Sequence, residues 1–222
     1  MRTLALIVLC ISVFAVVSCG PATRSQAAPQ CVWKVGDQGS AIFYAARDSQ
    51  WGQAARDLQS LKACTQQLQT EVKGNDDKKK KLEQDAGDIE RALSTQNREQ
   101  AMLSANDITL VATNIAAQYQ VSMPMDVPRL DYYARQLQIY AEANDIGKLK
   151  ATADQMKSTW QQVFVNLQSH VGPDDAKKMQ TIIDRLQAAK QPSEYQAAAN
   201  DAVSVVSDIE RLYGHVSGKS AS

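Results

Sequence analysis

Apolar residues recur every three or four positions along the chain from Gly39 to its end. That spacing puts them on one face of a helix, so it predicts helices with one buried stripe and a polar outer face. Two stripes are especially regular: Leu149, Ala153, Met156, Trp160, Val163 and Leu167 form one, and Tyr195, Ala198, Ala202, Val205, Ile209, Leu212 and Val216 form the other. A weaker stripe contains Ala54, Leu58, Leu61, Thr65, Leu68 and Val72. Steps that alternate between three and four are typical of antiparallel bundles with shallow crossing angles, and we therefore predict an all-α fold of antiparallel helical hairpins.

Breaks in the pattern divide the predicted helices into two groups. Residues 77–120 carry an apolar face that predicts one long helix, loosened at Gly87 and in the polar stretch 94–100. Residues 121–128 contain two prolines and two methionines and form the strongest internal break. We therefore expect an N-terminal helical subdomain at 31–121, made of a hairpin and the long helix. A unit similar to a four-helix bundle is expected at 122–218.

The second group contains a repeated helical hairpin. A shift of 49 residues superposes residues 137–164 on the stretch that follows, and a shift of 95 in the other direction places Gly147 on Gly52. Each unit is predicted to be a helix, a short polar turn and a second helix, with N-caps at Asp145 and Ser193. A duplicated hairpin explains these matches, and so does chance, because two amphipathic helices of similar composition align equally well.

The first twenty residues have the pattern of an export signal. Arg2 gives a positive start, residues 4–17 are almost all apolar, and Ser18 leads into Cys19. An apolar stretch of about 14 residues is too short to cross a bilayer as a helix, which needs roughly 20. The pattern resembles the type II signal of bacterial lipoproteins, in which a small residue precedes a cysteine that becomes lipidated.

The resemblance implies that residues 1–18 are removed and that Cys19 becomes the lipidated first residue of the mature chain. Three acyl chains on that residue would anchor it stably to a membrane, whereas one chain alone binds marginally. In Gram-negative lipoproteins an Asp after the Cys implies retention in the inner membrane, so Gly20 favours the outer membrane, with the chain facing the periplasm or the cell surface. Residues 19–30 are expected to be a flexible tether. An ordinary secretory signal cut within 22–29 is the alternative, and it would discard Cys19.

Two of the cysteines remain in the mature chain as candidates for a disulfide. An envelope protein folds in an oxidising compartment, so Cys31 and Cys64 are expected to pair. A straight helix from Ser40 to Cys64 would span about 36 Å. The nine residue steps from Cys31 to Ser40, at about 3.3 Å each, are too short to bring Cys31 back to Cys64 over that distance. We therefore predict a turn at residues 48–50 that folds 41–47 back on the following helix.

Composition and motifs restrict the possible functions. The chain has 24 basic and 24 acidic residues, and this balance argues against binding to nucleic acid. The two histidines, His170 and His215, stand near expected helix ends, and neither belongs to a Glu-x-x-His pair of the kind found in di-iron bundles. No Ser or Cys lies in a nucleophile elbow. We therefore expect no catalytic residue, no metal site and no cofactor, in a protein that is not an enzyme.

Residues 128–216 are similar to the periplasmic four-helix b-type cytochromes, which hold haem between a Met on the first helix and a His near the end of the last. Met123 and Met125 precede the first helix of this group, and His215 ends the last. The alignment that superposes the helices places Leu130 and Tyr213 at the two ligand positions instead. The resemblance implies an alternative function, a periplasmic carrier of haem or another small ligand in the core of the helical bundle.

One group of surface residues is a candidate interaction face, formed by Arg129, Tyr132 and Arg135. Tyr132 lies off the apolar stripe that holds Tyr133 and Tyr140, and both Tyr and Arg are favoured at the centres of protein interfaces. The leading hypothesis is a membrane-tethered lipoprotein that acts as a non-enzymatic binding or scaffolding module of the bacterial cell envelope. Its expected partners are the membrane, through the lipid anchor, and another envelope protein.

Overall fold

The computed structural model describes residues 27–167 and 173–213, which form helices joined by short connections, with no strand in these two ranges. The first four helices are α1 (Gln30–Arg47), α2 (Trp51–Glu71), α3 (Asp76–Ser94) and α4 (Arg98–Ala116). The next four are α5 (Asp126–Glu142), α6 (Ile146–Leu167), α7 (Pro173–Ala188) and α8 (Pro192–Leu212). The predicted all-α fold is therefore confirmed.

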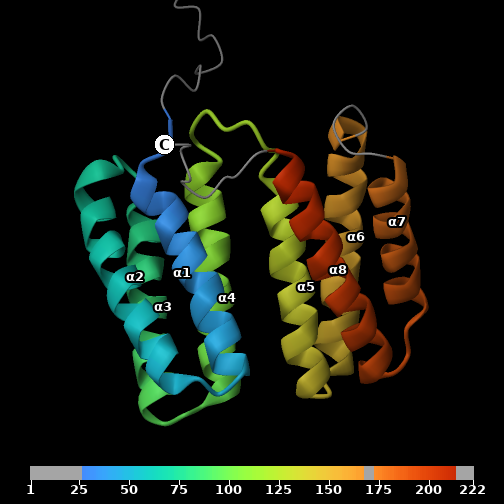
Figure 1. The fold of residues 1–222 in the computed structure, drawn as a ribbon, viewed down its shortest axis with the longest axis horizontal. Coiled ribbons are helices and arrows are strands. Elements are labelled where there is room, and N and C mark those ends of the chain that lie inside the picture. The colour runs from blue at the N-terminus through green and yellow to red at the C-terminus, as the bar shows by residue number, and fades with distance from the viewer. Residues whose placement is uncertain (1–26, 168–172, 214–222) are drawn as a thin grey trace, which may run out of the picture.

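The helices pack as two antiparallel four-helix bundles that lie side by side (Figure 1). In the first bundle, α1 and α3 both pack against α2 and α4. In the second bundle, α5 and α7 both pack against α6 and α8. The bundles meet where α4 packs against α5, and in Figure 1 the pair α1 and α4 faces the pair α5 and α8. Residues 117–125 connect the two bundles.

The chain between 77 and 120 forms two helices rather than the single long helix expected from its apolar face. Residues 95–97 separate α3 from α4. Gln96 has a left-handed φ of 52°, and the Asn97 side chain accepts a hydrogen bond from the Gln100 amide at 3.1 Å, which caps α4. The polar residues of this stretch end one helix and start the next. The N-terminal part is therefore a four-helix bundle and not a hairpin with a long helix.

The first helix begins earlier than the apolar pattern suggested. α1 starts at Gln30, the last residue of the expected tether, whereas the stripe could be traced only from Gly39. The turn expected at residues 48–50 is confirmed, and Ser49 supports it with a left-handed φ of 57°. As a result α1 folds back along α2.

The two bundles repeat one structural unit at the 95-residue offset that separates Gly52 from Gly147. At this offset α1 and α2 fall on α5 and α6, and the turns coincide, because Ser49 and Asn144 have left-handed φ values of 57° and 56°. The core positions that correspond are buried in both bundles, as in Val32 and Val127, Val35 and Leu130, Ile42 and Leu137, Leu61 and Met156, and Leu68 and Val163. α3 and α4 match α7 and α8 in order and packing. The correspondence therefore extends over whole bundles.

The predicted stripes form the bundle cores. Every residue of the stripe that begins at Leu149 is buried, and so is the stripe that begins at Tyr195 as far as Ile209. Leu212, which the pattern assigned to the same stripe, is 55% exposed at the last residue of α8. Val216 lies outside the described residues.

The expected helix caps of the second bundle are right in one case and wrong in the other. Asp145 caps α6, since its Oδ1 accepts a hydrogen bond from the Lys148 amide at 3.0 Å. The N-cap of α8 is Gln191 and not Ser193, and the Glu194 carboxylate accepts a hydrogen bond from the Gln191 amide at 3.0 Å. A proline is favoured at the first position inside a helix, so the cap moves to the residue before it.

Candidate binding cleft between the two bundles

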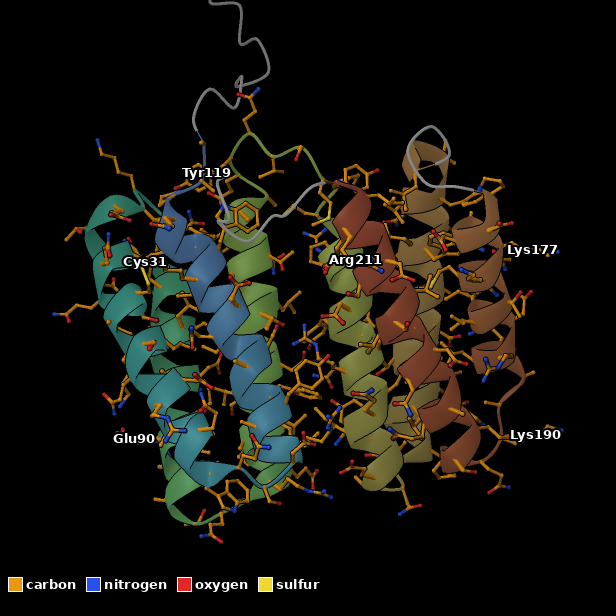
Figure 2. The ribbon with its side chains drawn as sticks, in the orientation of Figure 1. Cys31, Glu90, Tyr119, Lys177, Lys190 and Arg211 are labelled. Carbon is orange, nitrogen blue, oxygen red and sulfur yellow. A yellow bond between two sulfur atoms is a disulfide. The ribbon has the colours of Figure 1, made fainter. Side chains whose placement is uncertain are left out.

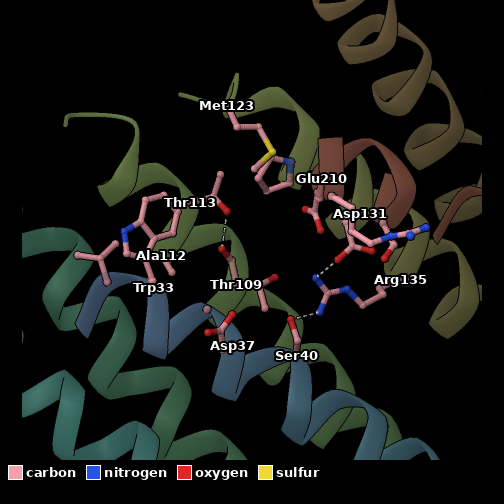
Figure 3. A pocket seen from close by; sticks show the side chains of 15 residues that line it. Trp33, Asp37, Ser40, Thr109, Ala112, Thr113, Met123, Asp131, Arg135 and Glu210 are labelled. Atoms are coloured by element: carbon pink, nitrogen blue, oxygen red, sulfur yellow. Dashed lines mark hydrogen bonds and ion pairs between the residues drawn. The ribbon is translucent and has the colours of Figure 1, made fainter. Parts of the chain in front are cut away.

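A cavity of about 280 Å³ lies between the bundles, where α1 and α4 face α5 and α8 (Figure 3). All four of these helices contribute side chains to it. The polar residues that line the cavity are Asp37, Ser40, Thr109, Thr113, Asp131, Arg135, Ser207, Glu210 and Arg211. The larger apolar side chains are those of Val32, Trp33, Met123 and Pro128. We call this cavity the inter-bundle cleft.

The inter-bundle cleft lies toward the end of the molecule at which α1 begins. Trp33 belongs to the first turn of α1, Pro128 to the first turn of α5, and Glu210 to the last turn of α8. Figure 2 shows Arg211 toward this end and Lys190 at the opposite end of the second bundle. The site is therefore built from helix ends, from the connection between the bundles and from the middle of α1, α4 and α5, where Ser40, Thr109 and Arg135 lie.

Arg135 is the buried charge of the cleft, with 2% of its surface exposed. Its Nη1 donates a hydrogen bond to Ser40 Oγ on α1 at 3.0 Å, and its Nη2 pairs with Asp131 one turn earlier on α5. The guanidinium carbon also lies 5.5 Å from the centre of the Phe43 ring. Among the described residues, no acceptor meets the Nε of Arg135, although a guanidinium can donate five hydrogen bonds. Arg135 therefore joins the second bundle to the first and keeps one buried donor unused.

Two further carboxylates face the cleft from opposite bundles, Asp37 on α1 and Glu210 on α8 (Figure 3). Within the described part of the chain, neither forms a hydrogen bond or an ion pair. Burial, together with the charges of Asp131 and Asp37, raises the pKa of Glu210 from 4.5 to about 7, although Arg135 opposes this shift. Burial also raises the pKa of Asp37. Near neutral pH, the cleft therefore holds one carboxyl group that is poised between its charged and neutral forms.

The three residues of the expected interaction face, Arg129, Tyr132 and Arg135, all contact the first bundle. Arg129 Nη2 donates a hydrogen bond to Asn114 Oδ1 on α4 at 3.0 Å, and the Tyr132 hydroxyl donates to Asp107 Oδ1 on α4 at 3.3 Å. Arg135 is buried against α1. The three residues share one side of α5, as the helical pattern indicated, and Arg129 and Tyr132 stay partly exposed there, so their role as an interaction face stays a prediction.

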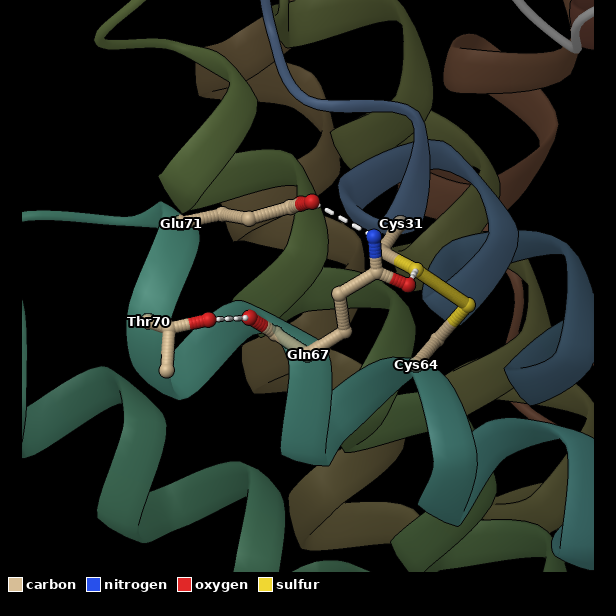
Figure 4. The surroundings of a disulfide bond; sticks show 5 residues. All are labelled: Cys31, Cys64, Gln67, Thr70 and Glu71. Atoms are coloured by element: carbon tan, nitrogen blue, oxygen red, sulfur yellow. Dashed lines mark hydrogen bonds between the residues drawn. A yellow bond between two sulfur atoms is a disulfide. The ribbon is translucent and has the colours of Figure 1, made fainter.

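The disulfide between Cys31 and Cys64 is present and supports one wall of the cleft (Figure 4). It joins the first turn of α1 to α2, with a Cα–Cα distance of 5.1 Å. Gln67 Oε1 lies 3.1 Å from Cys31 Sγ, and Gln67 is held in turn by Glu71. Because Trp33 follows Cys31 by two residues, the disulfide fixes the turn that carries this aromatic side chain.

Only some of the residues considered for haem ligation belong to the described part of the chain. Met123 lines the inter-bundle cleft, outside the core of the second bundle. Leu130 is fully buried in the core, and Tyr213 is half-buried at the end of α8. His170, His215 and the expected lipidation residue Cys19 lie outside the described residues.

Sequence reasoning missed Asp37 and Glu210. Glu210 follows the buried residue Ile209, so the helical pattern assigns it to the polar face of α8, where a solvated charge is the ordinary expectation. Asp37 lies in the same way on the polar side of α1, between the buried residues Val35 and Gly39. A polar face that meets another polar face inside the same molecule gives no separate signal in the sequence.

Residues 27–167 and 173–213 contain no group of three or more His, Cys, Asp or Glu side chains arranged to hold a metal ion. None of the helices in these ranges has both the length and the apolar character required to cross a membrane. Comparison of the chain with protein-family models, with curated proteins and with solved structures finds no match. The functional argument therefore rests on the geometry of the cleft.

Proposed function

We propose that the protein is a non-enzymatic binding module of the bacterial cell envelope, tethered to a membrane by lipid on Cys19, with the inter-bundle cleft as its binding site. The cleft carries this proposal, because it combines a cavity of about 280 Å³ with two carboxylates that form no ion pair among the described residues and one buried donor that lacks an acceptor there. Small-molecule sites commonly lie between domains and combine apolar walls with a few convergent polar groups. A recognition surface of this kind needs no reactive centre.

The position of the cleft suits a tethered protein. The eleven residue steps from Cys19 to Gln30 span at most about 36 Å at about 3.3 Å each. Trp33 and Val32, which line the cleft, belong to the first turn of α1 and so follow this segment directly. A lipid on Cys19 would therefore keep the cleft close to the membrane surface, where it could sample molecules of the envelope.

Replacement of Cys19 tests the tether. Cells grown with an alkyne-labelled fatty acid should label the wild-type chain and place it in the membrane fraction. Cys19→Ser should lose both the label and the membrane association. Cys10→Ser is the matched control, because Cys10 lies inside the expected signal and should not affect labelling. A Cys19→Ser chain that still carries fatty acid would refute the anchor.

A photoreactive side chain tests the cleft. The probe replaces Ser207, which is exposed and lines the cleft, and the control probe replaces Lys190, which is exposed at the opposite end of the molecule. After irradiation in cells, intact-mass spectrometry should find an adduct of defined mass from position 207 and none from position 190. Equal adducts from both positions, or none from position 207, would contradict the cleft as the binding site.

A further inference from the structure

Exposed apolar side chains gather at one end of the molecule. Among the described residues, the large apolar side chains that remain exposed are Val165, with 71% of its surface exposed, and Leu212, with 55%. Val165 belongs to the last turn of α6, and Leu212 is the last residue of α8. Both helices end on the side of the molecule at which α1 begins (Figure 1). We call this side the tether-side end, because the segment that follows Cys19 enters the fold there.

The connection between the bundles adds aromatic and apolar residues to the tether-side end. Residues 117–125 join α4 to α5 there and rise above the ends of both helices in Figure 1. This connection contains no charged residue, and Tyr119 and Val121 are partly exposed in it. Trp33, in the first turn of α1, is also partly exposed, and with Val121 and Ala27 it lines a hollow of about 200 Å³. The start of the fold and the connection therefore form one surface.

The opposite end of the molecule has a different character. Its four connections, 48–50, 95–97, 143–145 and 189–191, are short and mostly polar. No large apolar side chain among the described residues is exposed at this end. Trp51, the first residue of α2, is partly exposed there, and α1 keeps it away from Trp33, because 18 helical residues extend about 27 Å. The two tryptophans can therefore report on opposite ends of the molecule.

The length of the tether indicates what covers the tether-side end. Eight residue steps separate Cys19 from Ala27, the first described residue, and they span at most about 26 Å at about 3.3 Å each. A bilayer that holds a lipid on Cys19 therefore stays within about one helix length of this end. A short tether also makes contact with the bilayer effectively intramolecular, so even a weak apolar contact is populated.

The side chains at the tether-side end suit the surface of a bilayer. Tryptophan and tyrosine are enriched at the boundary between headgroups and hydrocarbon, because each combines an apolar ring with a polar group. Exposed charges at this end, such as Lys73 and Asp77, are of both signs. The attraction to a bilayer should therefore come from apolar contact and should persist at high salt.

We propose that the tether-side end lies against the lipid bilayer, with Trp33, Tyr119, Val121, Val165 and Leu212 at the boundary between headgroups and hydrocarbon. This inference rests on the lipid anchor of the proposed function, and it adds the orientation in which the anchored protein is held. The bundles then stand with their helices directed away from the membrane, and the opposite end faces the surrounding solution.

Fluorescence quenching by spin-labelled lipid tests this orientation. The lipidated mature chain is reconstituted in vesicles of phosphatidylethanolamine and phosphatidylglycerol that include a lipid with a nitroxide near its headgroup. Trp51→Phe leaves Trp33 as the reporter, and Trp33→Phe leaves Trp51; the buried Trp160 is a common background in both. The nitroxide lipid should quench the reporter at position 33 and not the one at position 51, and high salt should not change this result.

A charge at the tether-side end should release it from the bilayer. The matched variants, made in the Trp51→Phe protein, are Leu212→Asp and Ala197→Asp; Ala197 is exposed in the second turn of the same helix, near the opposite end. Leu212→Asp should lower the ratio of docked to undocked protein about tenfold, because a leucine that leaves water for an apolar environment contributes about that factor. Ala197→Asp should be quenched like its parent. Circular dichroism confirms that both variants are folded.

Three results would overturn the proposal. They are equal quenching of the reporters at positions 33 and 51, quenching that Leu212→Asp leaves unchanged, and a protein adduct in place of a lipid adduct from a photoreactive side chain at position 212 in cells. If the chain carries fatty acid and any of these results is found, the orientation is wrong and the anchor stands. If Cys19 carries no lipid, the proposed tether fails, and this inference fails with it.

Discussion

Replacement of Glu210 by glutamine is expected to stabilise the folded protein above pH 7 and to leave its stability nearly unchanged below pH 4.5. Glutamine keeps the shape of the side chain and removes its charge. In the folded protein the pKa of Glu210 is about 7, against an ordinary value of 4.5, chiefly because the carboxyl group is buried. The folded state therefore holds this proton more tightly than the unfolded state does.

The sign and size of the effect follow from this difference. Protonated Glu210 contributes stability that is complete below pH 4.5, declines as the pH rises toward 7 and is lost above pH 7. A pKa raised from 4.5 to about 7 corresponds to about 3 kcal/mol, and partial exposure of the side chain reduces this to about 2–3 kcal/mol. Glutamine carries no charge at any of these pH values, so the variant avoids that loss.

Urea unfolding followed by far-UV circular dichroism measures the difference. At pH 4 the wild type and Glu210→Gln should have similar free energies of unfolding, and at pH 8 the variant should be more stable by about 2–3 kcal/mol. Glu99→Gln, at an exposed position, should follow the wild type at both pH values. A difference that stays constant between pH 4 and pH 8, or a variant that is less stable at pH 8, would refute the assignment of a raised pKa to this carboxyl group.

Three further predictions concern the contacts that hold the bundles. Cys31 and Cys64 are separated by 33 positions in the sequence, and their disulfide restricts the unfolded chain. Replacement of both by serine should therefore lower the free energy of unfolding by about 3–4 kcal/mol. Addition of reductant to the wild type should give the same loss, and unequal losses would contradict this entropic explanation. Arg135→Ala leaves the half-buried Asp131 without its partner, so denaturant unfolding should show a free energy of unfolding lower by about 3 kcal/mol. The double variant with Asp131→Ala should recover part of this loss. An Arg135→Ala variant as stable as the wild type would show that the bundles do not depend on this pair. Gly39→Ala should destabilise by about 1–2 kcal/mol, because the new Cβ would lie 2.9 Å from Thr109 Cγ2 and 3.0 Å from the Ala105 carbonyl oxygen. Gly87→Ala, whose Cβ would lie 3.7 Å from Arg91 Nη1, should instead gain about 0.5–1 kcal/mol. Urea unfolding measures both glycine variants, and changes of equal sign would contradict the argument.

Part of the candidate site was predictable from local features of the sequence. Cys31 can reach Cys64 only if the chain turns between them, so the disulfide and the turn at 48–50 were predicted together from chain length. Both are present. The sequence also singled out Arg135, but as part of an interaction face for another protein. A pattern can show that Arg135 lies off the core of its own helix pair, but it does not show that Ser40, which is 95 residues away, receives its hydrogen bond.

The amino-acid sequence by itself determined the helices, their buried stripes and the cysteine pair, because each depends on residues that are close in the chain or on a period of 3.6 residues. It left open that residues 77–120 form two helices, because turn residues such as Gln96 and Asn97 weigh little against a continuous apolar face. Only the tertiary structure decided that two similar bundles face each other, bury Arg135, half-bury Glu210 and bring the exposed Asp37 to the same cleft. The physical reason is that polar side chains on three helices follow the same pattern whether they meet water or one another, and their burial depends on how the bundles dock.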